Sequence, residues 1–76
     1  MFRKVMKLKL SPIERDILYL LEEAGAEDYQ TLLVSLPTFT KAEVDQARQS
    51  LLKAGFISEV SSEVILTDAG RETLTR

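Results

Sequence analysis

Hydrophobic residues between positions 12 and 24 recur with the spacing of one face of a helix. They stand at i, i+4, i+7, i+8 and i+11 and are Ile13, Ile17, Leu20, Leu21 and Ala24. Ser11 precedes Pro12, and Glu14 stands three residues after the serine, so the segment begins with a capping box. Gly25 supplies the left-handed residue with which many helices end. This pattern predicts a helix over residues 12–24.

Two further helices are predicted between residues 28 and 55. Asp28 suits the N-cap of a short helix that Pro37 ends, with the apolar positions Leu32, Leu33 and Leu36. Thr40 and Glu43 form a second capping box, and Gly55 is the next left-handed stop. Between them one apolar stripe consists of Val44, Ala47 and Leu51. The stripe and its flanks predict a helix over residues 41–54.

The segment that follows has the composition of a β-hairpin. Residues 56–60 and 63–66 are rich in β-branched and aromatic side chains, which favour strands. Ser61 and Ser62 separate the two runs and suit the tip of a turn. We therefore predict two antiparallel strands after the third helix.

A last short helix is predicted at the end of the chain. Thr67 and Asp68 can cap it, and it extends to Leu74 with Gly70 inside, where glycine weakens a helix. The fold class predicted from all elements is α+β and mostly α. It consists of a three-helix core, a two-stranded hairpin and a short C-terminal helix.

Composition narrows the functional classes. The 76 residues include 10 Lys and Arg, 12 Asp and Glu, no Cys and no His, for a net charge of −2. A disulfide framework, a zinc cluster, a thiol nucleophile and an imidazole base are thereby excluded. Two acidic pairs, Glu22-Glu23 and Glu27-Asp28, flank Gly25 and are more typical of a solvated helix end than of a cation site. We therefore expect no enzyme, no cofactor and no metal.

Size and hydropathy predict one small domain. A chain of 76 residues builds a single thin core, which a second subunit can thicken. The longest apolar run covers residues 17–21, whereas a membrane span needs about 18 apolar residues. We therefore expect no membrane span and a cytoplasmic location.

Charge is unevenly distributed along the chain. Residues 1–10 carry a net charge of +4, from Arg3, Lys4, Lys7 and Lys9, whereas residues 11–76 carry −6. The hydrophobic residues Met6, Leu8 and Leu10 alternate with Lys7 and Lys9, and this period of two predicts a short strand. The sequence thus divides into a basic arm, residues 1–10, and a domain, residues 11–76.

The basic arm has three possible uses. As a strand it would pair with the hairpin or with a second copy of the chain, so that Met6, Leu8 and Leu10 form the contact of a homodimer. As a basic tail it would follow DNA phosphates with Arg3, Lys4, Lys7 and Lys9. The third use is a solubilising terminus without a partner.

The order of the predicted elements and several residues resemble the winged helix-turn-helix domains of MarR- and PadR-type transcription regulators. The resemblance covers about residues 10–74. It lies in the start of the first helix, the second helix, the third helix with the strand after it, and the string after the hairpin. The residues are Leu10-Ser11-Pro12, residues 32–36, Val44, Ala47, Leu51, Gly55, Ile57 and Leu66-Thr67-Asp68-Ala69-Gly70-Arg71.

The resemblance implies a small transcription regulator whose third helix lies in the major groove of double-stranded DNA, with the hairpin as the wing. With the apolar stripe facing inward, the outward residues of helix 41–54 are Ala42, Asp45, Gln46, Gln49 and Lys53. Gln46 and Gln49 suit adenine, since an amide both donates and accepts a hydrogen bond. Lys53, Lys41 and the hydroxyl of Thr40 suit phosphates. The alternative is that these glutamines and lysines are ordinary solvated residues.

Some residues depart from the family pattern. The predicted wing, residues 58–63, contains Glu59 and Glu63 and no basic residue, where these regulators usually carry Arg or Lys. Asp45 lies near the reading face and can pair with Arg48 or Lys41. The long terminal dimerisation helices of MarR-type proteins are missing. A second hypothesis is therefore a protein-binding module, in which the acidic wing and the third helix contact a protein partner with little or no DNA binding.

Overall fold

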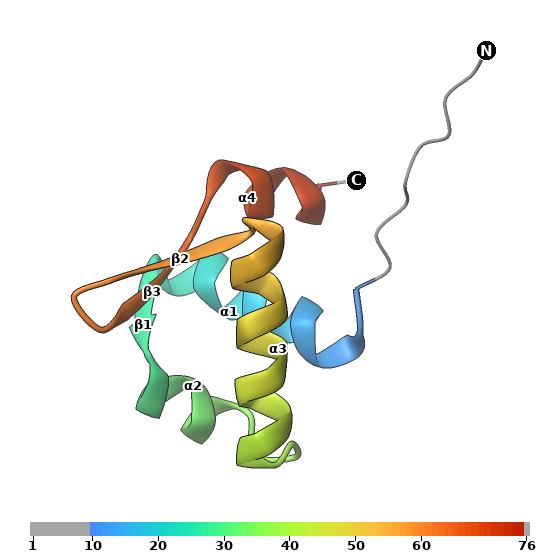
Figure 1. The fold of residues 1–76 in the computed structure, drawn as a ribbon, viewed down its shortest axis with the longest axis vertical. Coiled ribbons are helices and arrows are strands. Elements are labelled where there is room, and N and C mark those ends of the chain that lie inside the picture. The colour runs from blue at the N-terminus through green and yellow to red at the C-terminus, as the bar shows by residue number, and fades with distance from the viewer. Residues whose placement is uncertain (1–9, 76) are drawn as a thin grey trace.

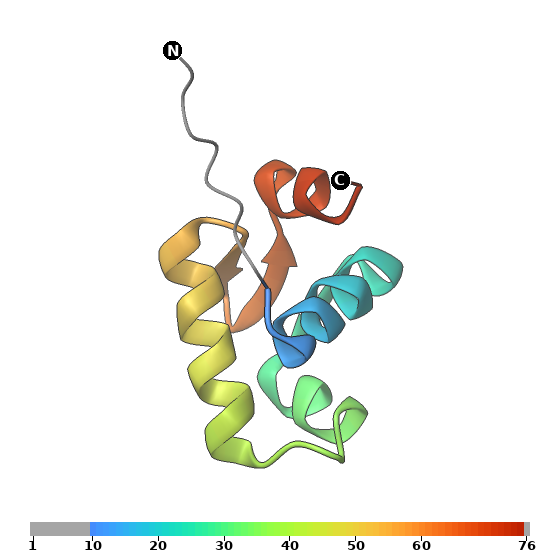
Figure 2. The ribbon, with the colours of Figure 1, turned by 90° about the vertical axis from the view of Figure 1, so that its right-hand side faces the viewer.

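The computed structural model describes residues 10–75, which form four helices and a three-stranded sheet. The elements in chain order are α1 (Pro12–Ala24), β1 (Ala26–Asp28), α2 (Tyr29–Ser35), α3 (Lys41–Ala54), β2 (Ile57–Val60), β3 (Glu63–Leu66) and α4 (Asp68–Leu74). The sheet lies at one edge of the molecule, where the β2–β3 hairpin projects away from the helices (Figure 1). The fold is α+β and mostly helical, as predicted. Figure 2 shows α3 along one side of the molecule, with α1 and α2 on the other.

The predicted capping boxes set the starts of the two long helices. The Ser11 amide donates to Glu14 Oε1 at 2.9 Å, and the Glu14 amide donates to Ser11 Oγ at 3.3 Å. The same exchange joins Thr40 and Glu43, with distances of 2.8 and 3.1 Å. Because these bonds satisfy amides that the first helical turn leaves free, α1 and α3 begin where the sequence predicts.

The hairpin belongs to a larger sheet than predicted. β3 pairs antiparallel with β2 on one side and with β1 on the other, with Asp28 opposite Glu63. The predicted hairpin is confirmed, and the third strand was missed because β1 has three residues, none of them β-branched or aromatic, so its sequence carries no strand signal. The hairpin tip is as predicted, and Ser61 and Ser62 both have positive φ, as a two-residue turn of matching twist requires.

The hydrophobic core lies between α1, α3 and the sheet. It includes the predicted stripe of α3 together with residues from every other element except β1 and α4: Ile17, Leu18, Leu21, Leu32, Leu36, Val44, Ala47, Leu51, Phe56, Ile57, Val64 and Leu66. Ala24 is exposed and Leu18 is fully buried, so the predicted inner face of α1 was wrong at these two positions. Leu10 packs against this core and belongs to no strand.

A close backbone contact holds α4 against the segment after α3. The Phe56 carbonyl accepts a hydrogen bond from the Thr67 amide at 3.1 Å. Gly70 is buried, and a Cβ atom added there would lie 2.1 Å from the Phe56 carbonyl oxygen. The glycine that the sequence marks as a weak point of the helix is therefore the residue that permits this approach.

Candidate functional site

The side of α3 that faces away from the core forms a shallow surface hollow. It is lined by six residues from this helix alone, which we call the outer face: Ala42, Asp45, Gln46, Gln49, Ser50 and Lys53. Five of them are the residues predicted to face outward, and Ser50 is added. Helical periodicity places them on the same side of α3, at spacings of three and four residues.

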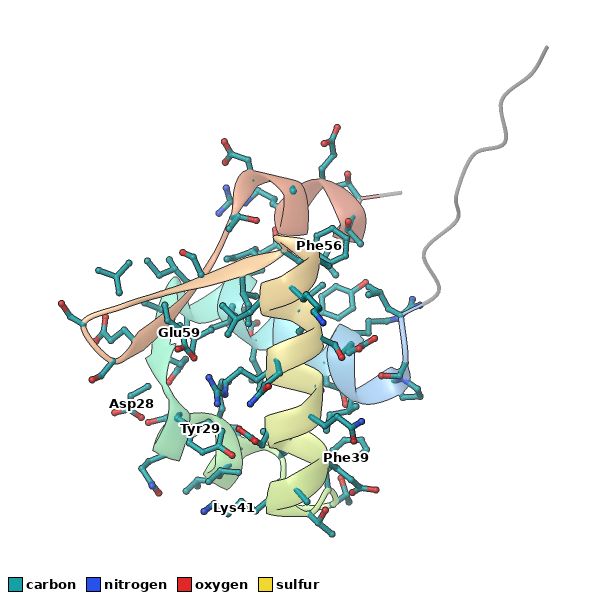
Figure 3. All side chains as sticks on the ribbon, in the orientation of Figure 1. Asp28, Tyr29, Phe39, Lys41, Phe56 and Glu59 are labelled. Carbon is teal, nitrogen blue, oxygen red and sulfur yellow. The ribbon has the colours of Figure 1, made fainter. Side chains whose placement is uncertain are left out.

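Apart from Asp45, the polar side chains of the outer face have no partner among residues 10–75. Gln46, Gln49, Ser50 and Lys53 are exposed, and none of them forms a hydrogen bond or an ion pair with any residue between 10 and 75. Lys41 is exposed at the N-terminal end of the same helix (Figure 3). These side chains can therefore bond to a ligand without breaking a contact in the folded domain.

Thr40 differs from the other predicted phosphate contacts. Its hydroxyl oxygen accepts the Glu43 amide at 3.1 Å, and its own amide donates to the Glu43 carboxylate. Thr40 thus sets the start of α3, and its hydroxyl keeps its proton and one acceptor position for another partner.

On the side of α3 that faces the hairpin, Arg48 joins three elements. Its Nη2 atom lies 2.6 Å from Asp45 Oδ1 on the same helix, and its Nη1 atom donates to Glu59 Oε2 on β2. Its guanidinium carbon lies 4.9 Å from the ring centroid of Tyr29 at the start of α2. We call these four residues the Arg48 junction; Tyr29 and Glu59 are labelled on the same side of α3 in Figure 3.

The arginine at the centre of the junction is largely shielded from water, and its two carboxylate partners are not. The Arg48 side chain is 18% exposed, against 42% for Asp45 and 36% for Glu59. The hydrogen bond that Arg48 donates to Asp45 raises the pKa of Arg48, burial lowers it, and the hydrogen bond to Glu59 and the charges of both carboxylates raise it further. Within the described part of the chain, Tyr29 Oη and Arg48 Nε are buried without a hydrogen-bond partner. Arg48 is therefore a permanently charged link between α2, α3 and the hairpin.

The sequence identified half of this junction. Spacings of three and four residues within one helix indicated Arg48 or Lys41 as the partner of Asp45, and the structure selects Arg48. The contact with Glu59 was missed because it joins residues 11 positions apart whose distance depends on how the hairpin packs. No local sequence signal encodes that packing.

A second hollow lies between α1 and the end of α2. Its volume is about 540 Å³, and its lining, which we call the α1–α2 hollow, consists of Asp16, Tyr19, Leu20, Glu22, Glu23, Ser35 and Leu36. Tyr19 is 49% exposed there although it is a large hydrophobic residue. The hollow thus combines an apolar floor with acidic side chains and contains no basic residue.

Several predicted site residues lie outside the described residues. They are Arg3, Lys4, Met6, Lys7, Leu8 and Lys9. Of the predicted dimer contact, only Leu10 is described, and it packs against the core of its own chain. Within residues 10–75 no three acidic side chains converge as ligands of a metal ion, and the Asp28 carboxylate accepts the Thr31 amide at 2.8 Å.

The described residues also contain no helix with both the length and the apolar character needed to cross a membrane. Comparisons with protein-family models, with curated proteins and with solved structures give no match.

Proposed function

We propose that the protein binds double-stranded DNA by placing the outer face of α3 in the major groove, as a small winged-helix transcription regulator. The observation that carries this proposal is that Gln46, Gln49, Ser50 and Lys53 share one exposed helix face and have no partner among the described residues. Donors and acceptors on one free helix face are the chemistry that reads base edges.

The dimensions of α3 fit this use. Its 14 residues extend about 21 Å, and a helix with side chains is about 10–12 Å wide, close to the width of the major groove. The order of helices and strands is compatible with a winged helix-turn-helix, in which α2 and α3 are the paired helices and the β2–β3 hairpin is the wing. Gln46 and Gln49 would then bond to bases, and Lys41 and Lys53 to phosphates near the two ends of α3.

The Arg48 junction weakens an electrostatic objection. Asp45 belongs to the outer face, and a free carboxylate there would repel phosphate. Asp45 is paired with Arg48 at 2.6 Å, which reduces the negative potential beside the reading residues. The same arginine also contacts Glu59 in the hairpin, so one positive charge serves two carboxylates and the three groups keep a net charge of −1. The acidic wing predicted to oppose DNA binding thus keeps Glu63, which forms no ion pair among the described residues, and part of the charge of Glu59.

Weak and moderately salt-dependent binding is expected. Residues 10–75 contain all twelve acidic residues and five of the ten basic ones, a net charge of −7. Two lysine contacts to phosphate predict a slope of log K against log salt of about −2, since each contact contributes about −0.9. Dimerisation would raise the affinity by adding a second half-site, and it remains a proposal together with the regulatory role.

Selection from a random duplex library at low salt, followed by affinity measurements, tests the proposal. Gln46→Ala and Gln49→Ala should each weaken binding to the selected sequence by about 1–3 kcal/mol, or about 5- to 150-fold. Gln30→Ala is the matched control, because Gln30 is an exposed glutamine of α2 outside the outer face. Equal affinities for all three variants, or no enriched sequence, would reject the proposal.

A contact with a basic or apolar protein surface is the second candidate, favoured by one observation. Val60, at the end of β2, is 55% exposed beside the acidic residues of the hairpin. In an amide NMR titration with duplex DNA at low salt, this candidate predicts no shifts along α3. It further predicts that Glu63→Lys abolishes binding of the partner, whereas Glu27→Lys on β1 does not.

A further inference from the structure

The α1–α2 hollow is an unpartnered surface of unusual composition. Tyr19, Leu20 and Leu36 give it apolar surface, whereas Asp16, Glu22 and Glu23 surround them with negative charge. None of these three acids forms an ion pair with any residue between 10 and 75. Apolar surface with an acidic border suits a chain segment in which hydrophobic and basic side chains alternate.

Such a segment exists in the chain itself. Residues 2–9 contain four basic residues and no acidic one, and two of them, Lys7 and Lys9, alternate with Met6 and Leu8. In an extended backbone, successive side chains point to opposite sides. Met6 and Leu8 would then share one side with Phe2 and Lys4, whereas Arg3, Lys7 and Lys9 would share the other side with Val5. The chain's most basic segment therefore complements the hollow in both charge and hydropathy.

The segment is long enough to reach the hollow of its own chain. Leu10 packs against the core just before α1, which fixes the starting point of residues 1–9. From Ser11 to Glu23 the rise along α1 is about 18 Å, whereas nine extended residues span up to about 30 Å. A tethered segment experiences an effective concentration of the order of millimolar, which favours its own chain over a second copy.

We propose that residues 2–9 dock in the α1–α2 hollow of the same chain, with Met6 and Leu8 toward Tyr19 and Leu20, while the long basic side chains bend toward the acidic border of Asp16, Glu22 and Glu23. The docked segment covers the exposed Tyr19 ring. The positive charges of the docked segment are then compensated by the acidic residues of the hollow. A polyanion must therefore displace residues 2–9 from the hollow before it can bind their basic side chains. The proposal goes beyond DNA binding by α3 and does not depend on it.

Disulfide crosslinking tests the proposal in the full chain, because the sequence contains no cysteine of its own. Met6→Cys is combined with Ser35→Cys in the hollow, or with Ser50→Cys on the outer face of α3 as the matched control. Both serines are exposed, so both pairs should fold. Single-cysteine variants titrated with a thiol reagent correct for the different reactivity of the two positions.

We expect an intramolecular disulfide in the Met6–Ser35 pair to form on the order of tenfold faster than in the control pair, at a rate that does not depend on protein concentration. The double variant Glu22→Lys with Glu23→Lys should slow disulfide formation in the Met6–Ser35 pair. The double variant Glu27→Lys with Glu63→Lys changes the net charge by the same amount at sites outside the hollow and should not slow it. Equal rates for the two pairs would overturn the proposal. Crosslinked dimers in place of monomers would overturn it as well, because the occupant would then be the segment of a second copy.

Discussion

The outer face of α3 and the Arg48 junction lie on the same helix and differ in what their polar groups contact. Gln49 follows Arg48 directly in the sequence, yet Gln49 is exposed and free among the described residues, whereas Arg48 is 18% exposed and contacts three side chains. A polar group that is already paired contributes to the folded state, and a free one is available to a ligand. The residues of the Arg48 junction thus hold α3 in place, whereas the unpaired residues of the outer face are available to contact a ligand.

Asp45 belongs to both regions and shows how they depend on each other. It lines the outer face, and its carboxylate contacts Arg48. The charge that a ligand meets on α3 therefore depends on a residue that the ligand does not touch. Variants of the junction, Asp45 included, should change stability first and binding second, and variants of the other outer-face residues should change binding alone.

The largest effect on stability is expected where the segment after α3 meets α4. In Gly70→Ala the new Cβ would lie 2.1 Å from the Phe56 carbonyl oxygen and 2.8 Å from Leu66 Cδ1, so the backbone must move. Overpacking costs about 1–3 kcal/mol, and we expect a loss of about 2 kcal/mol in the free energy of unfolding, measured with urea. Ser50→Ala, at an exposed helical position, should be neutral or slightly stabilising. A stabilised Gly70→Ala variant would contradict the close contact.

The next largest effect on the free energy of unfolding is expected at the Arg48 junction. Arg48→Met keeps a long side chain on Tyr29 but leaves Asp45 and Glu59 without their partner. Because both carboxylates are more than a third exposed, water recovers part of the loss, and we expect about 1 kcal/mol of destabilisation.

Lys53→Met is the matched control for Arg48→Met, since it removes a positive charge from the outer face of the same helix. It should stay within about 0.5 kcal/mol of the wild type. A double-mutant cycle of Arg48→Met with Glu59→Gln isolates the link between α3 and the hairpin. If Lys53→Met were as destabilising as Arg48→Met, the distinction between the two sides of α3 would fail.

A smaller effect that depends on pH is expected at the start of α2, beside the junction. The Asp28 carboxylate accepts the Thr31 amide, and this hydrogen bond lowers the pKa of Asp28 below its ordinary value of 3.8. A lowered pKa contributes stability above 3.8, and the contribution is lost as the pH falls through the lower folded value. Asp28→Asn keeps a capping oxygen and removes the titration. Its stability deficit, measured with urea, should therefore shrink as the pH falls below 3.8, and a constant deficit would contradict this role.

The sequence predicts contacts between residues that are close together in the chain, and it does not predict contacts between residues that are far apart in the chain. The caps at Ser11 and Thr40 act within three residues, so their sequence patterns suffice. The outer face follows from helical periodicity once the apolar stripe of α3 is known. β1 could not be predicted, because its pairing with β3 decides its conformation. The role of Gly70 and the contact from Arg48 to Glu59 likewise arise from tertiary packing.

The smallest effect on stability is expected on the outer face, and it separates the two regions most sharply. Gln49→Ala removes a side chain with no partner among the described residues, so the free energy of unfolding should stay within about 0.5 kcal/mol of the wild type. If Gln49 reads a base, the same variant loses affinity for the selected DNA and keeps its affinity for random duplexes, since phosphate contacts are unaffected. Filter binding to both duplexes, with urea unfolding of the same samples, measures the two quantities together. Suppose that Gln49→Ala were destabilised and kept the wild-type ratio of its affinity for the selected DNA to its affinity for random duplexes. Gln49 would then contribute to the stability of the fold, as Arg48 does, and not to reading bases. The outer face would then be a solvated surface, because a residue that reads bases must change this ratio.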